Sequence, residues 1–503
     1  MNMKLKASIE GAALIMAITC ACVLAGLGGT TYYVLQSKYR VVHQAASWDE
    51  ALLSAEAGIE MAMNEIRRDL RDDAGAWQGW SASATPIDGS SAGQTPGATE
   101  EEMTYKFTSQ TILRQGEGGQ RSWAEVSVDA PLFLQDRTGE QWFRIRSLGV
   151  AEVPGGSIAA GEKQDLRLRK FDLRWNRRTQ RPVVGGRPQT GRLIEAVAKP
   201  VGAFRLALLG VNGINLNNHN IVVDSYDSRD PEKSRNGGYP FTDMTTDGTK
   251  LKRQENGDIA TNGQLIQAGN AHVHGDALTN GGTVLNSSNV TGEIRDDFFQ
   301  EVITVKQPTT PPDDGTPTAI NHQSVVLTAK ANSPSSYVFS ALNLSGQNIL
   351  KVEGAADGSP TYCQIVVTGN ISLSGQSQIQ LGTNVYARIF VVGDASVSGN
   401  GFSNPNSPLH LQFYGCNRPK NADGTIAYGN ISISGNGGFC GAVYAPNYNI
   451  AMAGGGSTDN IFGAFVGNNV SMTGVQAVHY DEALAEGGLI SDFKIVSWFE
   501  DER

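Results

Sequence analysis

Asn430-Ile-Ser-Ile-Ser-Gly435 shows the pattern that decides the fold of this 503-residue chain. Ile431 and Ile433 stand two positions apart, each is followed by a serine, and a glycine closes the unit. Residues two apart on a β-strand point to the same face, so both isoleucines would face one core. The closing glycine suits a turn, because it adopts a positive φ at little cost. The unit therefore predicts a short strand that ends in a tight turn.

The same unit recurs through the C-terminal region. Clear copies span 370–375, 394–399, 430–435, 449–454 and 469–474, with an earlier copy at 269–275 and a weaker one at Ile214 and Leu216. The second apolar residues of the clear copies are spaced by 24, 36, 19 and 20 residues. A period near 20 with loops of variable length predicts a parallel β-solenoid over 206–485, in which stacked coils share one core.

We expect the copies to stack in register, with Asn and Ser side chains forming ladders between coils. A second apolar segment precedes several copies, as at 389–392, and would form another face of each coil. A β-sandwich or jelly roll is the competing fold, and it would show stricter alternation and fewer near-identical turns. The predicted stacked row contains the second apolar residue of each clear copy: Leu373, Val397, Ile433, Met452 and Met472.

The region before the repeats has a different pattern. Apolar and polar residues alternate at 123–128, 142–147 and 193–198, which predicts an antiparallel sheet with one wet face over 103–205. Residues 75–102 are rich in Ser, Ala, Gly, Thr and Pro and show no periodicity, so they predict a linker.

One segment near the N-terminus is apolar enough to cross a membrane. Residues 12–35 carry no charge, and about 20 apolar residues span a bilayer as a helix. Lys4 and Lys6 precede the segment, so the positive-inside rule places the N-terminus in the cytoplasm and the bulk of the chain outside. A cleaved signal peptide that ends near Val23-Leu24-Ala25 is the alternative.

The apolar segment continues into an amphipathic one. From Trp48 to Leu70, apolar residues recur every three or four positions, the period of one helix face. We therefore expect one helix over 12–74, half in lipid and half packed on the predicted sheet. A discarded signal peptide would not need this arrangement.

Two stretches of the predicted helix read EGAALI at 10–15 and AEAGIE at 55–60. With the apolar run between them, they resemble the N-terminal region of PilX-type and GspK-type minor pilins, accessory subunits of type IV pili and type II secretion pseudopili. The resemblance implies that residues 1–11 are a leader and that a prepilin peptidase cleaves between Gly11 and Ala12. It also implies a pilin-like domain, in which a sheet lies on the helix.

One position departs from the pattern of major pilins, which carry a glutamate at the fifth mature position. Counted from Ala12, this position is Met16, and a methionine forms no ion pair with the N-terminal amine of a neighbouring subunit. The departure favours a minor or tip subunit.

The C-terminal region also resembles a known type of domain. Its stretches VDSYDS at 223–228, NGDIATNG at 256–263 and HYDEAL at 479–484 are similar to those of bactofilin-like β-helical domains that follow PilX-type N-termini. The resemblance covers about residues 205–500 and supports the architecture more than an activity. Residues 486–503 are predicted to form a C-terminal tail.

These observations predict a structural protein rather than an enzyme. We expect a minor pilin that primes or caps a pilus-like filament and presents the solenoid for adhesion. The implied partners are other pilin-like subunits, the assembly platform, prepilin peptidase, the inner membrane and surface glycans. The protein would be a single-pass inner-membrane protein with a periplasmic bulk, and extracellular once assembled. A membrane-tethered, β-helical polysaccharide-active enzyme is the alternative.

The charge balance argues against a nucleic-acid partner. The formal net charge is −10, whereas dedicated nucleic-acid binders are normally basic. Arginines gather between Lys163 and Arg205, but few aromatic residues interleave with them, so a solvated strand face explains them more simply than an anionic partner. This group contains Arg174, Arg177, Arg178, Arg181, Arg187 and Arg192.

No group of residues forms a convincing catalytic or metal centre. Asp224, Asp227 and Asp230 are close in sequence but fit no calcium loop, and Asx turns explain them better. His272 and His274 would share one face of a strand, but a metal site needs further ligands. We therefore expect no cofactor and no metal. The acids of the repeats are scattered in loops: Asp394, Asp423 and Asp459.

The five cysteines divide by location. Cys20 and Cys22 lie in the apolar segment, where cysteine serves as a small apolar side chain. Cys416 would end its strand while Cys440 would begin the corresponding strand of the next coil. The offset of roughly five residues exceeds the reach of a disulfide, so we do not expect a Cys416–Cys440 bridge, and the disulfide state of Cys363, Cys416 and Cys440 is left open.

Overall fold

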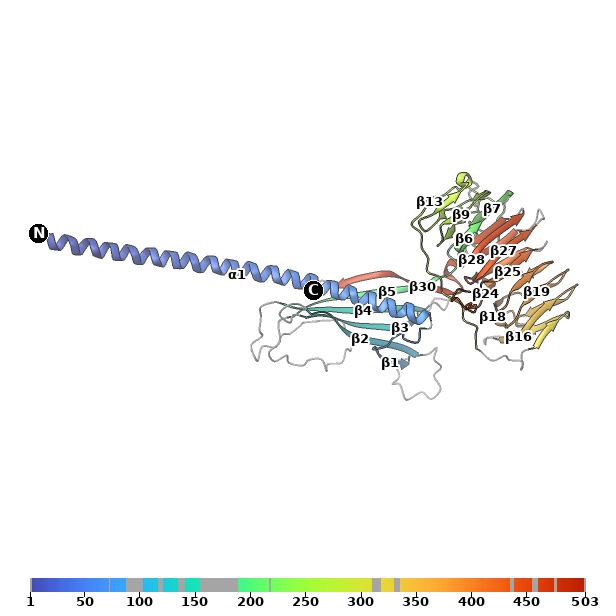
Figure 1. Ribbon diagram of the computed structural model, residues 1–503, viewed down its shortest axis with the longest axis horizontal. Helices are drawn as coiled ribbons and strands as arrows, with labels where there is room; N and C mark the ends of the chain where they lie inside the picture. The colour runs from blue at the N-terminus through green and yellow to red at the C-terminus, as the bar shows by residue number, and fades with distance from the viewer. Residues whose placement is uncertain are drawn as a thin grey trace. The chain divides into compact units, whose positions relative to one another are not determined.

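The computed structural model describes residues 2–71, 73–86, 103–115, 121–133, 141–153, 189–216, 219–309, 318–329, 335–434, 438–454, 460–474 and 477–501. Within these residues the chain is mainly β-structure with one long helix (Figure 1). The chain divides into two compact units, Met1–Lys199 with Lys494–Arg503, and Pro200–Phe493. The second unit is thus inserted in the sequence of the first.

The helix α1 spans Asn2–Leu70 and has two parts with different surroundings. Apolar side chains of the first part are exposed, for example Leu24 and Leu27. In the second part, buried residues recur every three or four positions, as the sequence predicts. These buried residues are Ala51, Ala55, Ile59, Ala62 and Ile66.

The first unit contains a six-stranded sheet in the order β1-β2-β3-β4-β5-β30. Neighbours from β1 to β5 pair antiparallel. Buried residues alternate along the central strands, and the buried set of β3 and β4 lies against α1. The strands are β1 (Ser81–Pro86), β2 (Met103–Gln115), β3 (Arg121–Phe133), β4 (Gln141–Glu152), β5 (Gln189–Gly202) and β30 (Ile490–Asp501).

Two segments differ from their sequence-based assignments. Part of the predicted linker 75–102 forms the edge strand β1, which pairs with β2; the rest, 87–102, lies outside the described residues. The predicted tail 486–503 contains β30, which lies beside β5 and completes the first sheet. Both strands are recruited by backbone hydrogen bonds to a preformed edge, and such bonds leave no side-chain pattern in the sequence.

The helix and the sheet approach closely at two glycines, Gly58 of α1 and Gly149 of β4. A Cβ atom at Gly58 would lie 2.1 Å from the Ser147 hydroxyl, and one at Gly149 would lie 1.9 Å from the Ala51 carbonyl oxygen. Real Cβ atoms do not approach other atoms so closely, so glycine is required at both contacts. Gly58 belongs to the AEAG stretch, and the contact gives that stretch a packing role.

Gly149→Ala should therefore destabilise the first unit. The added methyl group must displace the α1 backbone, and we expect a loss of roughly 3 kcal/mol in unfolding free energy. Gly191→Ala on the paired strand is the matched control, because its Cβ would meet Leu148 at an ordinary 3.5 Å. Thermal unfolding of the two full-length variants checks this; equal melting temperatures would contradict the close packing.

The second unit is a parallel β-solenoid. Strand pairs along the stack are parallel and in register, which excludes an antiparallel sandwich for the described coils. The strands are β6 (Leu208–Asn215), β7 (His219–Tyr226), β8 (Ile259–Thr261), β9 (Leu265–Gln267), β10 (Asn270–Val273), β11 (Ala277–Leu278), β12 (Thr283–Leu285), β13 (Ile294–Arg295), β14 (Thr318–Asn321), β15 (Val325–Thr328), β16 (Ser335–Leu344), β17 (Ile349–Glu353), β18 (Thr361–Val367), β19 (Ile371–Leu373), β20 (Gln378–Leu381), β21 (Val385–Val391), β22 (Ala395–Val397), β23 (Gly401–Ser403), β24 (Leu411–Gly415), β25 (Gly429–Ser434), β26 (Phe439–Ala445), β27 (Tyr448–Gly454), β28 (Asn460–Gly474) and β29 (Ala477–Asp481).

The predicted stacked row is confirmed. Leu373 pairs with Val397, Val397 with Ile433, Ile433 with Met452, and Met452 with Met472. Ile433 is only partly buried, whereas the parallel row two residues earlier is almost fully buried there. That inner row runs through Leu342, Ile371, Ala395, Ile431, Ile450, Val470, Ile214 and Ile266.

The predicted ladders and turns are also present. The Asn370 side chain accepts a hydrogen bond from the Asp394 amide, and Asp394 accepts one from the Asn430 amide. The turn residue Gly399 has a φ of 79°, and a Cβ there would lie 2.0 Å from the carbonyl oxygen of Gly375 in the adjacent coil. Asn370 and Asp394 therefore each satisfy a backbone donor of the next coil, Asn449 accepts from the side chains of Asn468 and Asn469, and glycine lets the turns stack.

The earlier copy at 269–275 does not join this row. Its strand β10 pairs with β7, which also pairs with β29 on a different face of the solenoid. Ala271 and Val273 are buried there, so this copy forms a strand with its apolar pair in the core, on a face other than that of the five clear copies.

The order of coils in space differs from their order in the chain. β6 pairs with β28, so the first coil of the sequence stacks on the last one. From β6 the chain continues through β8 and β11 to β13 at one end; the next strand, β14, lies at the other end beside β16. The coils then return to β28, as the labels in Figure 1 show. The solenoid is therefore entered and left at neighbouring coils in its middle.

A strap made of residues 298–306 follows β13 and crosses the outside of the coils. The Gln300 carbonyl oxygen accepts a hydrogen bond from Asn262, Ile303 exchanges hydrogen bonds with the Tyr444 hydroxyl, and Val305 bridges to Cys416. Ile303 and Val305 are buried. The strap thus covers apolar surface of coils that lie far apart in sequence.

Candidate functional site

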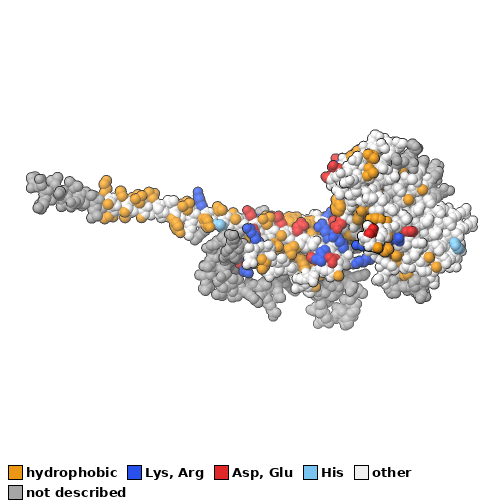
Figure 2. Space-filling view, in the orientation of Figure 1, with side chains coloured by type: hydrophobic (Ala, Val, Ile, Leu, Met, Phe, Trp, Pro, Cys, Tyr) orange, Lys and Arg blue, Asp and Glu red, His pale blue; other side chains and the backbone are white. Residues whose placement is uncertain are grey.

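The first part of α1 is the one described helix long and apolar enough to cross a membrane. Its apolar side chains are exposed, and Figure 2 shows them gathered along the N-terminal part of the helix. Its polar side chains are satisfied internally: Thr19, Thr30 and Thr31 each donate a hydrogen bond to the backbone carbonyl four residues earlier. Lipid offers no hydrogen-bond partners, so this arrangement suits a membrane-spanning helix.

The residues of the predicted processing site all lie in α1. Gly11 and Ala12 fall within the helix, and Met16 is 71% exposed. Cleavage after Gly11 stays a prediction. Cys20 and Cys22 are exposed on the same part of the helix.

The second unit contains a buried polar cluster on its β7–β29 face. Asp224 of β7 is 1% exposed and accepts a hydrogen bond of 2.6 Å from the Tyr239 hydroxyl. The other Asp224 oxygen lies 2.5 Å from Nδ1 of His479, whose ring stacks on Tyr239 at 3.6 Å. Arg253 lies 4.0 Å from the same carboxylate. These contacts tie the loop 227–257, defined as the segment between β7 and β8, to the solenoid.

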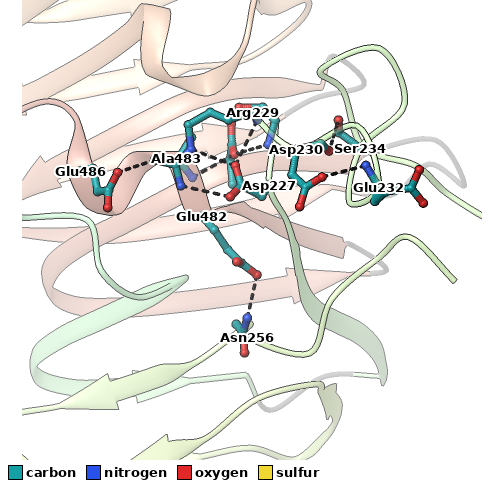
Figure 3. Close-up of polar contacts among 11 residues, drawn as sticks. Asp227, Arg229, Asp230, Glu232, Ser234, Asn256, Glu482, Ala483 and Glu486 are labelled. Carbon is teal, nitrogen blue, oxygen red and sulfur yellow. Dashed lines mark hydrogen bonds and ion pairs between the residues drawn. The ribbon is translucent and has the colours of Figure 1, made fainter. Parts of the chain in front are cut away.

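A second cluster holds the same loop at its base (Figure 3). Asp481, at the start of the short helix η5 (Glu482–Glu486), accepts hydrogen bonds from the amides of Ser228 and Ala483. Arg229 contacts both Asp227 and Glu486, and Glu482 accepts from Asn256 at 2.8 Å. Although burial opposes ionisation, the hydrogen bonds from Arg229 keep the pKa of Asp227 below its usual value.

The three aspartates considered for calcium therefore have separate partners. Asp224 binds Tyr239 and His479, Asp227 binds Arg229, and Asp230 accepts from the amide of Glu232. Within the described residues no three His, Cys, Asp or Glu side chains are placed to hold a metal ion. The cluster acts as a structural lock on the loop, and no site of chemistry is apparent in it.

The buried carboxyl group of Asp481 should make the free energy of unfolding depend on pH. Burial raises the pKa of Asp481, and one of its oxygens has no described hydrogen-bond partner. The folded state therefore keeps a proton that the unfolded state releases above about pH 4, and stability falls as pH rises through the folded pKa. The Asp481→Asn variant has no carboxyl group to ionise at this position. Its free energy of unfolding, relative to that of the unmodified protein, should therefore increase as pH rises from about 4 through the folded pKa of Asp481.

Thermal melts of both proteins across acidic to neutral pH measure that difference. Asp357→Asn is the control of opposite sign, because the Ser359 amide holds the pKa of the exposed Asp357 below its usual value. A melting-temperature difference for Asp481→Asn that stays constant with pH would contradict a buried, partly protonated carboxyl group.

The remaining candidate residues lie apart from one another. His272 is exposed on β10, and His274 follows it on a turn. Asp394 serves the Asn ladder, Asp423 caps a turn at Thr425, and Asp459 lies outside the described residues. Of the clustered arginines, those from 174 to 187 also lie outside, whereas Arg192 pairs with Glu500.

The cysteines are free thiols in this structure. Burial raises the pKa of the Cys416 and Cys440 thiols to about 12, so neither is a reactive thiolate at neutral pH. Cys363 is buried and aligned with Ala387 of the next coil. This agrees with the expectation of no Cys416–Cys440 bridge.

Comparison with known proteins adds a family match for part of the chain. Residues 328–487 match a family model described as a domain of unknown function, DUF7305. No curated protein sequence matches the chain. The crystal structure of the competence-associated pilin ComZ from Thermus thermophilus matches with 10% identity and a TM-score of 0.24, covering 90% of this chain and 97% of that one. At this TM-score the match does not establish a shared fold.

Proposed function

We propose that the protein is a pilin-like subunit anchored in the inner membrane by α1. One observation carries the proposal: α1 passes without interruption from an exposed apolar part into a part that packs on an antiparallel sheet. A helix of this kind can sit in the bilayer before assembly and pack against other such helices in a filament afterwards. The proposed partners are pilin-like subunits, the assembly platform and prepilin peptidase.

We assign the protein a minor role, as a subunit that primes or caps a filament. Met16 offers no charge to a neighbouring subunit's amine, which suits a position where no earlier subunit is contacted. The second unit comprises Pro200–Phe493, a large body to repeat along a thin filament. The solenoid would then act as an adhesive surface at the filament tip.

The membrane orientation can be tested on spheroplasts. Lys4 and Lys6 precede the apolar segment, so the globular units should lie outside the inner membrane. Added protease should remove an epitope tag fused to the C-terminus in intact spheroplasts, while a cytoplasmic marker protein survives. Full protection of the tag in spheroplasts, with removal only after lysis, would reverse the proposed topology.

Gene deletion tests the assembly role. The deletion strain should carry fewer filaments or attach more poorly, and the intact gene should restore both. The protein should also co-purify with filaments sheared from complemented cells. Normal piliation and attachment in the deletion, together with glycan cleavage by the purified protein, would reject the proposal in favour of an enzyme.

A further inference from the structure

Three neighbouring coils present an outward grid of side chains on β18, β21 and β24. Tyr362 pairs with Tyr386, Gln364 with Arg388, and Arg388 with Gln412, all in register. The rings of Tyr362 and Tyr386 stack at 5.1 Å, and Tyr386 stacks on His410 at 4.0 Å. The grid therefore has an aromatic column beside a polar one.

The grid is accessible at its centre and on the Tyr362 side. Tyr362 is 51% exposed, Arg388 is exposed, and Tyr386 and Gln364 are half-buried. No hydrogen bond joins either tyrosine hydroxyl to another described residue, so both are available to a ligand. Along β18 and β21 these residues alternate with buried ones, as expected for an outward face, whereas Gln412 on β24 is buried.

Arg388 is unusual for its surroundings. Residues 360–416 contain only one other charged residue, Asp394, which serves the Asn ladder and lies 3.8 Å from Arg418. Arg388 forms no ion pair with a described residue. An exposed guanidinium that forms no ion pair with a described residue is suited to bind a carboxylate with two parallel hydrogen bonds.

We propose that this grid binds an acidic polysaccharide of the uronate class. Arg388 would hold a sugar carboxylate, while Gln364 and the tyrosine hydroxyls would bind neighbouring sugar hydroxyls. Coils repeat at the spacing of β-strands, so one chain of sugars can follow the column and add weak contacts. An acidic peptide would offer carboxylates to the same guanidinium, and competition by polyglutamate distinguishes the two kinds of ligand.

This assignment deepens the proposed adhesive role and rests on it. The full-length protein in detergent micelles should bind a fluorescein-labelled oligogalacturonate by anisotropy, and unlabelled alginate should compete while neutral dextran should not. Arg388→Gln should weaken binding roughly tenfold or more, since a charge-assisted hydrogen bond is lost. Arg388→Lys should weaken it less, and Tyr362→Ala should cause a smaller loss.

Lys420→Gln is the matched control, because it removes an exposed positive charge from the same unit, outside the grid. Its affinity should be unchanged. Absence of oligogalacturonate binding, equal losses in Lys420→Gln and Arg388→Gln, or equal competition by dextran, polyglutamate or single-stranded DNA would overturn the assignment. Filament incorporation without oligogalacturonate binding would reject the ligand alone, whereas binding without incorporation would reject the pilin-like role alone.

Discussion

Ile450→Asp should unfold much of the solenoid, whereas the same change at the neighbouring Ala451 should be tolerated. Ile450 is 1% exposed and lies between Ile431 and Val470 in the inner row. An aspartate there would place a carboxylate in apolar surroundings without a partner, at a cost of about 4 kcal/mol or more. Since each coil is stabilised by its two neighbours, the loss should spread along the stack.

Ala451→Asp is the matched control, because Ala451 is exposed on the same strand. Limited proteolysis of the two full-length variants should cut the solenoid of Ile450→Asp rapidly and spare that of Ala451→Asp. Equal resistance would show that the inner row is not the core. Ile433, in the neighbouring row, is a weaker probe of the solenoid core, because it is only partly buried.

Asp224→Ala should release the loop 227–257 and destabilise the second unit. The substitution leaves the buried Tyr239 hydroxyl and His479 Nδ1 without their shared acceptor, and each buried polar group left unsatisfied costs about 1–3 kcal/mol. We expect a lower melting temperature and new protease cleavage within the loop.

Asp296→Ala removes an exposed acid from the same unit and should change neither measurement. A loop that stays protease-resistant in Asp224→Ala would mean that the Asp481 cluster alone holds it in place.

The solenoid was predictable because each clear repeat contains both an apolar pair and, before it, an Asn or Asp. The apolar pair of each copy marks the core, and the Asn or Asp before it, as at Asn370 and Asp394, accepts a hydrogen bond from a backbone amide of the next coil. Leu373, Val397 and Ile433 therefore align in the structure as the sequence predicts. A copy this short fits more than one face of the coil, and 269–275 lies on the β7–β29 face instead of the face of the clear copies.

The order of the coils could not be predicted from the repeats. Every coil end offers the same backbone donors and acceptors. No local sequence feature therefore specifies that β6 stacks on β28, or that β14 lies at the end of the solenoid opposite β13. The edge strands β1 and β30 were missed for a related reason, since backbone pairing to an existing edge needs no particular side chains.

The candidate sites depend on contacts between distant parts of the sequence. Asp224 and His479 are separated by 255 residues and meet because β7 pairs with β29. Arg388 and Gln364 belong to different coils and become neighbours only through the register of β18 and β21. Neither pairing leaves a short motif, whereas the apolar segment at 12–35 is a single uninterrupted run and is visible directly in the sequence.

The position of the mature N-terminus decides whether the chain is processed as a pilin-like subunit. The full-length protein should be expressed with and without a prepilin peptidase, and its N-terminus determined by mass spectrometry. The pilin-like account predicts a chain that starts at Ala12 only when the peptidase is present, and loss of this processing in Gly11→Val. A start near Gly26 independent of the peptidase, or an unprocessed chain in its presence, would contradict the account.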